Sequence, residues 1–472
     1  MTDVVVIGAG PAGVMASLRA ADLGARTTLL TSGAFGGMAA NDGPVPVRAL
    51  AHAARLMREA RQLGAYGITV SEPLLDYGAL LARVADVVGD VGRNSALRAQ
   101  VDVAGVTVLE GVGRARFSDA HTIETAAGRR ITADKIILCT GGVSRSLPIP
   151  GFELTATHSD AWSLSAAPAS MLVIGSGATG AQVTSVFNAF GVQVQLFEAG
   201  PRILRAEEPE VSACVAAAFR EAGFVVHEDF GTIEAFEPTA GGVRMIYTKN
   251  GERKTAEAAL VVSAVGWTGD TEALNLKIAG VEVDERGFVR TKADLQTTAP
   301  HVFAAGDITG KRMLAPQALH AGVVAATNAV LGGAESAAHP VNPVGSFTDP
   351  EYAQVGLGEV QARETSDVAV ASVGFDETTR AIIDGRTAGF CKLIVDRRSH
   401  AILGCHIVGE RAVDVAQIAA VAMAAGMTVD DLARVPLSFP TYAGVLGRAA
   451  AVATRAMNRD RGASTLSAPD YA

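Results

Sequence analysis

The chain has 472 residues, more than one hydrophobic core usually holds, which predicts two or three domains. Apolar residues make up 49% and glycines number 51, a composition typical of α/β proteins with many tight turns. A net charge of -9 argues against nucleic-acid binding, and no apolar run has the length of a membrane span. The chain enters a strand pattern at once, without a secretory leader, so we expect a cytoplasmic protein.

The N-terminal segment has the pattern strand, glycine turn, helix, strand. Thr2 to Ile7 predicts the first strand, a helical pattern continues through Leu23, and Arg26 to Leu30 predicts the next strand. In this setting a GxGxxG motif lets the backbone approach a pyrophosphate at a helix N-terminus. The motif residues are Gly8, Gly10, Pro11, Ala12 and Gly13.

A mainly helical region follows the first unit. Residues 45–64 and 77–100 predict helices, whereas Val106–Leu109 and Thr122–Thr125 predict antiparallel strands. A return strand and a glycine turn close the region, at Lys135–Cys139, Thr140 and Gly141.

The same order of elements begins again about 170 residues later, which indicates an internal repeat. Ser170–Ile174 predicts a strand, a helix runs to Phe190, and the strand Gln193–Phe197 ends in Glu198. Because both motifs stand between a strand and a helix, we expect one to hold FAD and the other a nicotinamide nucleotide. The glycines of the second motif are Gly175, Gly177 and Gly180.

Glu198 bears on the choice of nicotinamide nucleotide. A carboxylate at this strand end accepts hydrogen bonds from the adenosine ribose and repels a 2′-phosphate, which favours NADH over NADPH. Arg202 and Arg205 lie nearby and leave NADPH open. The equivalent position in the first unit is Thr31, whose hydroxyl predicts a weaker contact with the FAD ribose.

The pattern changes again from about Pro343, as β segments and helices there indicate a separate C-terminal domain. The predicted segments are Gly389–Val395, Ala401–Val408, Val413–Ala425 and Val429–Ala433, followed by a flexible tail at 461–472. No two of the four cysteines have the spacing of a redox or metal pair, so each is expected to pack as a small apolar residue and no metal site is predicted. They are Cys139, Cys214, Cys391 and Cys405.

The segment Gly36 to Arg48 resembles GGTCxNxGCxPxK, the redox segment of the flavoprotein disulfide reductases, a family that includes dihydrolipoamide dehydrogenase, glutathione reductase and mercuric reductase. Other motifs of that family match along nearly the whole chain. They are Thr140-Gly141-Gly142, Ala264-Val265-Gly266, Ala304-Ala305-Gly306-Asp307, Met313-Leu314-Ala315-Pro316 and Phe347-Thr348-Asp349-Pro350-Glu351.

The resemblance implies an α/β protein with two Rossmann-like dinucleotide-binding domains and a C-terminal α+β dimerisation domain. The implied FAD-binding domain spans 1–150 and 267–335, the NAD(P)-binding domain 151–266, and the dimerisation domain 340–460. A homodimer is therefore expected. Beyond the motif residues already named, cofactor contacts are expected at Gly36, Gly37, Arg48, Thr140, Gly141, Gly266, Gly306, Asp307, Leu314 and Ala315.

The chain departs from the family where thiol chemistry would occur. Ala39 and Pro44 stand in place of the two redox cysteines. In the C-terminal HPTxxE motif, Phe439 replaces the histidine and Gly444 replaces the glutamate. The acid–base pair that serves the thiols is thus lost together with the thiols, so disulfide reduction is disfavoured.

Four residues are candidates for direct roles in electron transfer. Arg48 and Gln182 replace a lysine and a glutamate that pair beside the flavin in the family. Arg48 would stabilise reduced flavin, and Gln182 would help place the nicotinamide. Phe439 and Tyr442 of one subunit would shape an aromatic acceptor pocket at the flavin of the other.

The leading hypothesis is an oxidoreductase that passes hydride from NADH to FAD and then electrons to a small-molecule acceptor, a quinone or similar aromatic. In this respect the chain is similar to the NAD(P)H quinone reductases that lack the disulfide. Two alternatives stay open: an oxidase or dehydrogenase specific for one metabolite, with Ser438, Thr441 and Tyr442 as substrate contacts, and a redox-silent nucleotide-binding protein.

Overall fold

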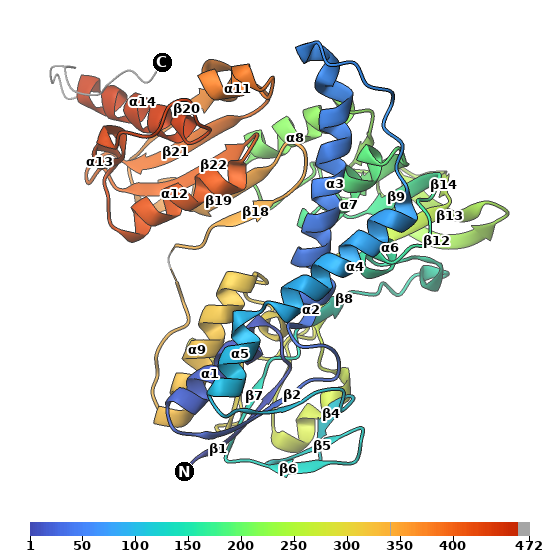
Figure 1. The fold of residues 1–472 in the computed structure, drawn as a ribbon, viewed down its shortest axis with the longest axis vertical. Coiled ribbons are helices and arrows are strands. Elements are labelled where there is room, and N and C mark those ends of the chain that lie inside the picture. Colours follow the sequence, from blue (N-terminus) through green and yellow to red (C-terminus); the bar gives the residue numbers. More distant parts are fainter. Residues whose placement is uncertain (340, 461–472) are drawn as a thin grey trace.

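The computed structural model describes residues 1–339 and 341–460, so the tail predicted at 461–472 lies outside the described residues. Figure 1 shows three lobes, each built on one larger sheet: an N-terminal lobe at the bottom, a middle lobe at the right and a C-terminal lobe at the upper left. None of the helices described in these two ranges has the length and apolar character needed to cross a bilayer.

The N-terminal lobe is built on a five-stranded sheet in the order β17-β7-β1-β2-β3, with every pair parallel. Successive residues of β1 point to opposite faces: Val4 and Val6 pack under the helices, and Val5 and Ile7 pack on the other side. The strands are β1 Asp3–Ile7, β2 Arg26–Leu30, β3 Thr107–Leu109, β7 Lys135–Leu138 and β17 Val302–Ala304.

Helices α1 and α9 cover one face of this sheet in close contact with each other. Small residues permit the approach, since a Cβ on Gly322 would lie 2.2 Å from the Ala12 carbonyl oxygen. A small antiparallel sheet, β4-β5-β6, contributes to the other face. The bounds are α1 Pro11–Asp22, α9 Ala315–Leu331, β4 Ala115–Phe117, β5 Thr122–Thr125 and β6 Arg130–Thr132.

The prediction that Val106–Leu109 and Thr122–Thr125 are antiparallel strands was wrong as to their pairing. β3 joins the edge of the main sheet parallel to β2, whereas β5 pairs antiparallel with β4 and β6. The reason is the helical excursion between β2 and β3, which returns the chain to the end of the sheet where β2 began. That excursion comprises α2 Gly37–Asn41, α3 Pro44–Gln62, η1 Leu63–Tyr66, α4 Tyr77–Arg93 and α5 Ala96–Val103.

The middle lobe repeats the strand–helix–strand plan around a parallel sheet, β11-β10-β9-β15. An antiparallel sheet, β12-β13-β14, packs against it. The two-stranded sheet β16-β8 belongs to the connections between this lobe and the N-terminal lobe. The bounds are η2 Phe152–Leu154, α6 His158–Trp162, β9 Ser170–Ile174, α7 Ala178–Ala189, β10 Gln193–Glu198, α8 Pro209–Glu221, β11 Val225–Glu228, β12 Thr232–Thr239, β13 Gly242–Lys249, β14 Glu252–Ala258 and β15 Leu260–Ser263, with β8 Gly142–Ser144 and β16 Trp267–Gly269 in the connections. Three short helices after β16 pack on the N-terminal lobe: η3 Glu272–Leu274, η4 Leu276–Ala279 and η5 Asp307–Thr309.

The C-terminal lobe holds an antiparallel sheet, β18-β19-β22-β21-β20, whose core includes residues of α12, α13 and α14. The last helix, α14, is long and was not predicted individually. The bounds are β18 Val344–Ser346, β19 Tyr352–Gly356, α10 Glu359–Thr365, β20 Val368–Gly374, η6 Phe375–Glu377, α11 Thr379–Ile383, β21 Phe390–Asp396, β22 Ile402–Val408, α12 Ala412–Ala424, α13 Val429–Arg434 and α14 Gly444–Asp460.

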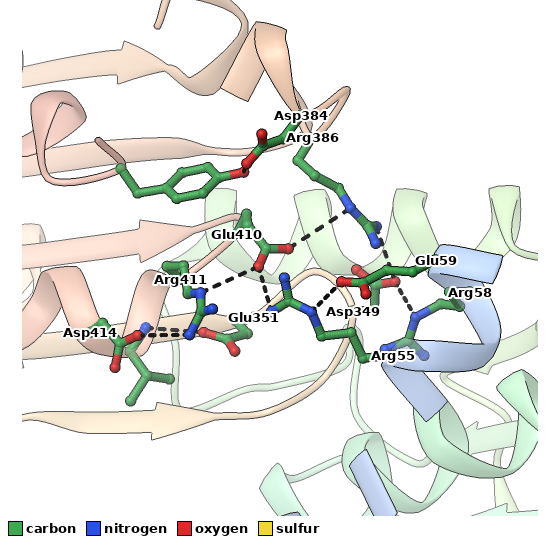
Figure 2. Close-up of polar contacts among 12 residues, drawn as sticks. Arg55, Arg58, Glu59, Asp349, Glu351, Asp384, Arg386, Glu410, Arg411 and Asp414 are labelled. Carbon is green, nitrogen blue, oxygen red and sulfur yellow. Dashed lines mark hydrogen bonds and ion pairs between the residues drawn. The ribbon is translucent and has the colours of Figure 1, made fainter. Parts of the chain in front are cut away.

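Charged side chains connect helix α3 of the N-terminal lobe to the C-terminal lobe (Figure 2). Arg55 pairs with Glu410 at 2.7 Å and Arg58 with Asp349 at 2.5 Å, while Arg386 lies 3.6 Å from the same aspartate. Because Glu410 and Arg386 are largely buried, these pairs are screened less than surface pairs. The network therefore helps to fix the C-terminal lobe against α3.

Candidate functional site

A cavity of about 640 Å³ runs between the N-terminal and middle lobes. It takes its walls from the first glycine loop, the α2–α3 junction, and the N-terminal ends of α7 and α9. Most residues predicted to hold the first dinucleotide line it. These are Gly8, Gly10, Pro11, Ala12, Thr31, Gly37, Thr140, Gly141, Gly306, Asp307, Leu314 and Ala315.

The first glycine loop is packed too closely for side chains. A Cβ on Gly8 would lie 2.2 Å from the Cys139 carbonyl oxygen, and one on Gly13 would lie 1.7 Å from the Gly8 oxygen. Gly37 has φ 57° and stands against Gly10, where a Cβ would come within 2.7 Å of the Gly10 Cα. Gly36 donates its backbone N–H to the Ala9 carbonyl at 2.9 Å. Gly13 and Gly36 thus shape the loop from outside the cavity wall.

Helices α1, α7 and α9 begin without a side-chain cap. The N-cap residues are Gly10 for α1, Gly177 for α7 and Leu314 for α9, and none of them caps its helix through a side chain. The first backbone N–H groups of such helices are free to bind a ligand, and the helix dipole favours negative charge there. The arrangement suits the pyrophosphate of a dinucleotide and the anionic edge of a reduced flavin.

Asp307 and Thr31 supply polar contacts inside the cavity. Burial raises the pKa of the Asp307 carboxyl, and no described residue gives this side chain a hydrogen bond. The Thr31 hydroxyl donates to the Gly33 carbonyl at 3.1 Å and can still accept a bond from a ligand. Both side chains fit the hydroxyl-rich chain of FAD, because each offers it an acceptor.

The second glycine loop lies outside the cavity and is organised by Glu198. One oxygen of this carboxylate accepts bonds from the backbone N–H of Ser176 at 3.2 Å and from its hydroxyl at 2.6 Å, and the other accepts the Gly200 N–H at 2.7 Å. Glu198 therefore lies beside Gly175 and Gly177, as a ribose contact requires. Arg202 is occupied by three backbone carbonyls, whereas Arg205 stays exposed. Gly180 packs on Gly175, and Gly266 has φ 112° after β15.

Arg48 and Gln182 meet through Phe347. The Arg48 guanidinium lies 3.4 Å from the centre of the Phe347 ring, which is a cation–π contact. The Gln182 side chain accepts the Phe347 backbone N–H at 3.5 Å. Gln182 and Phe347 line the cavity, whereas Arg48 stands behind the phenylalanine and is exposed in the single chain.

The cavity wall carries no sulfur at the two positions where the resemblance placed cysteines, since Ala39 and Pro44 line it there. Cys139 is the one cysteine among the described lining residues, and its thiol is buried. Burial raises the pKa of that thiol to about 12, which keeps it protonated. Cys391 and Cys405 are also buried, and Cys214 is partly buried, as their expected packing role requires.

Facing Asp42, in the segment between Ala39 and Pro44, the structure places His158, which the sequence analysis missed. His158 is 6% exposed, lines the cavity, and lies 5.0 Å from Trp267 between ring centres. Its Nε2 is 3.4 Å from the Ser159 hydroxyl and 3.9 Å from Asp42 Oδ2, and that hydroxyl donates to Asp42 at 2.5 Å. Burial lowers the pKa of His158, whereas the negative charges of Asp42 and Asp160 act to raise it.

A sequence signal for this cluster existed. Thr157 and Asp160 form a capping box, in which each side chain bonds the other's backbone N–H, and the box starts helix α6 at His158. The T-x-x-D spacing predicts such a helix start. That the histidine then faces Asp42, 116 positions earlier, depends on how the lobes pack and is not visible in the sequence.

Phe439 and Tyr442 do not line this cavity in their own chain. Phe439 is 66% exposed, next to a small hollow formed with Arg380 and Arg448. The Tyr442 hydroxyl donates to Asp384 at 2.8 Å, and burial together with that carboxylate raises the pKa of the phenol. A role at a partner's flavin therefore stays a prediction for both residues.

Comparison with known proteins assigns the architecture. A family model described as pyridine nucleotide-disulphide oxidoreductase matches residues 2–322, and the dimerisation-domain model of the same name matches residues 342–450, which supports a homodimer. Dihydrolipoyl dehydrogenase from Geobacillus stearothermophilus is 32% identical over 461 residues, 96% of each chain. Mercuric reductase from Lysinibacillus sphaericus is 31% identical over 445 residues, 93% of this chain and 80% of that protein.

A solved structure gives the same result for the fold. The HOCl-induced flavoprotein disulfide reductase RclA from Escherichia coli superposes with a TM-score of 0.84 at 24% identity, covering 95% of this chain and 99% of that one. The predicted α/β fold class with a dimerisation domain is thereby confirmed.

Proposed function

The chain belongs to the pyridine nucleotide-disulphide oxidoreductase family, and on that premise we propose that it passes electrons from NAD(P)H through FAD to an acceptor that is not a disulfide. A quinone or a similar flat aromatic molecule is the acceptor class we favour. Members of the family use FAD and NAD(P)H, and bound FAD would supply the step between a two-electron donor and the acceptor.

The residues that would hold the two cofactors are those already located. The cavity between Gly8 and Asp307 would take FAD, with the N-terminal ends of α1 and α9 turned toward its charged groups. The loop Gly175–Gly177 with Glu198 would take the nicotinamide nucleotide, and the carboxylate favours NADH. Gln182, at the start of the middle lobe's helix, would orient the nicotinamide beside the flavin.

The observation that carries the proposal is the wall at Ala39 and Pro44. A disulfide reductase needs a thiolate there to attack the substrate's sulfur. Ala39 and Pro44 offer none, and the buried Cys139 thiol stays protonated. Electrons would then have to leave the flavin directly, and the aromatic side chains Trp162 and Trp267, which line the same cavity, suit a flat acceptor.

The test is anaerobic mixing of the FAD-loaded protein with NADH, and separately with NADPH, followed by menadione. Flavin absorbance at about 450 nm should bleach with NADH and recover on addition of the quinone. Lipoamide and glutathione disulfide serve as controls and should leave the flavin bleached. Recovery with a disulfide but not with menadione would contradict the proposal, as would a flavin that neither nucleotide bleaches.

A further inference from the structure

A histidine and an aspartate line the cavity where the chain runs from Ala39 to Pro44, and a serine behind them bonds to both. His158 and Asp42 line the cavity, and Ser159 links them, with its hydroxyl 3.4 Å from the imidazole Nε2 and 2.5 Å from the carboxylate. His158 is the one histidine among the described lining residues. Its ring is held between the capped start of α6 and the indole of Trp267.

We propose that His158 is the proton donor to the acceptor, with Ser159 and Asp42 as the residues that position it and return its proton. The inference rests on the proposed function, because it concerns the acceptor of that same site. His158 lines the cavity of its own chain and would act in addition to Phe439 and Tyr442, which are expected to come from the partner subunit.

Quinone reduction requires such a group. A quinone becomes a hydroquinone by gaining two electrons and two protons. A hydride that originates in the C–H bond of NADH brings both electrons and one proton, so a second proton must reach the other quinone oxygen. Transfer from the His158 ring breaks one N–H bond and forms one O–H bond, which balances NADH, quinone and proton against NAD⁺ and hydroquinone. A positioned acid at this step contributes roughly 100-fold or more to the rate.

The cluster has a route to water for the return proton. The Asp42 side chain is 39% exposed, whereas that of His158 is 7% exposed. A proton taken up from solvent at Asp42 can pass through the Ser159 hydroxyl to the imidazole. The other titratable groups that line the cavity lie outside this cluster. Asp307 follows the Gly306 turn, Cys139 is a buried thiol, and Arg114 lies 3.8 Å from Asp270.

The chain contains two tryptophans, Trp162 and Trp267, and both line this cavity. Their fluorescence therefore reports whether a quinone enters the site, independently of turnover. The charged groups that face His158 are Asp42 from the α2–α3 junction and Asp160 from its own helix, and Trp267 from β16 brings no charge. Substitution of His158 can therefore show which part of the pH dependence of the menadione rate belongs to this residue.

The experiment compares wild-type holoprotein with His158→Gln, using menadione and ferricyanide as acceptors. Ferricyanide takes up an electron without a proton and needs no acid. We expect His158→Gln to lower the menadione rate about 100-fold and the ferricyanide rate less than about twofold. Menadione should quench tryptophan fluorescence with the same affinity in both proteins. His52→Gln, which replaces an exposed histidine of α3, is the matched control and should leave both rates unchanged.

The pH profile gives a second readout. Burial holds the pKa of His158 below the usual range of a histidine. In the wild-type protein the menadione rate should therefore be highest at acidic pH and fall as the pH rises through that lowered pKa, because the donor loses its proton, and this step should be absent from His158→Gln. Equal losses with both acceptors, no loss with menadione, or a weakened affinity that accounts for the whole effect would each overturn the proposal.

Failure of the proposed function gives a different pattern. If NADH and NADPH leave the wild-type flavin oxidised, the protein is reduced with dithionite and the two acceptors are added. A selective loss of menadione reoxidation in His158→Gln then still supports the proton donor, while the NAD(P)H half of the proposed function fails. If menadione does not reoxidise the wild-type flavin, both proposals fail.

Discussion

In the proposed function, the choice of nucleotide and of acceptor depends on single side chains. Glu198 is the clearest case, since one of its oxygens is bonded to Ser176 of the second glycine loop and the other to Gly200 after β10. These bonds hold the loop's shape, and in the proposed nucleotide site the carboxylate would repel a 2′-phosphate. Arg202, which might have balanced that charge, is occupied by backbone carbonyls.

We predict that Glu198→Gln lowers the preference for NADH over NADPH about tenfold, which corresponds to about 1.4 kcal/mol of binding free energy. The reason is the loss of repulsion toward the extra phosphate together with a weaker contact to the ribose. The measurement is kcat/KM for each nucleotide with menadione. Glu228→Gln, at the paired end of β11, is the control and should keep the wild-type preference. An unchanged ratio in Glu198→Gln would contradict the assignment.

At the scale of elements, the site depends on how closely the α2 segment packs on the first glycine loop. Gly37 begins α2 in a left-handed conformation and lies directly against Gly10 at the start of α1. The same contact sets the wall in which Ala39 stands. The geometry of the flavin site is therefore shared between two segments that are far apart along the chain.

Gly37→Ala should reduce FAD occupancy and destabilise the fold by about 1–3 kcal/mol, because the new Cβ would meet the Gly10 backbone at 2.7 Å in a conformation that alanine rarely adopts. The ratio of flavin to protein absorbance and the thermal midpoint measure both effects. Gly64→Ala is a suitable control, since its Cβ would meet nothing within 4 Å and its φ is ordinary. Full occupancy in Gly37→Ala would show that the loop tolerates a shift.

At the scale of the whole molecule, the lobes are joined by charges that the packing partly buries. Burial raises the pKa of Glu351, at the start of β19, to about 7, and nearby Glu410 adds to the effect while Arg48 opposes it. The carboxyl is thus protonated in the folded protein at pH values where it is ionised in the unfolded chain. Arg48 links this region to Phe347 and so to the cavity.

The raised pKa of Glu351 makes the stability of the protein depend on pH. Between about pH 4.5 and 7 the folded state binds more protons than the unfolded state, so the free energy of unfolding contributed by Glu351 falls as the pH rises. Glu351→Gln should remove that contribution and have the higher thermal midpoint at pH 8, at equal protein concentration. Glu364→Gln, an exposed control on α10, should follow the wild-type curve. Parallel curves for wild type and Glu351→Gln would refute the prediction.

The fold class could be predicted from the residues alone, because repeated strand–glycine–helix units and family motifs depend on local spacing. Gly8, Gly13 and Gly175 could be assigned in this way, since the motif needs glycine where the backbone takes a positive φ, as at Gly8 and Gly175, and where the helix packs on the turn, as at Gly13. The missing cysteines at Ala39 and Pro44 were also visible without a structure.

Contacts between side chains of distant elements could be learned only from the three-dimensional packing. The pairing of β3 with β2 depends on where a helical excursion returns, and local alternation does not encode that choice. His158 reaches Asp42, and Arg48 reaches Gln182 through Phe347, because separate elements pack together. Such contacts depend on the full three-dimensional arrangement, whereas turns and strands follow from the residues next to them.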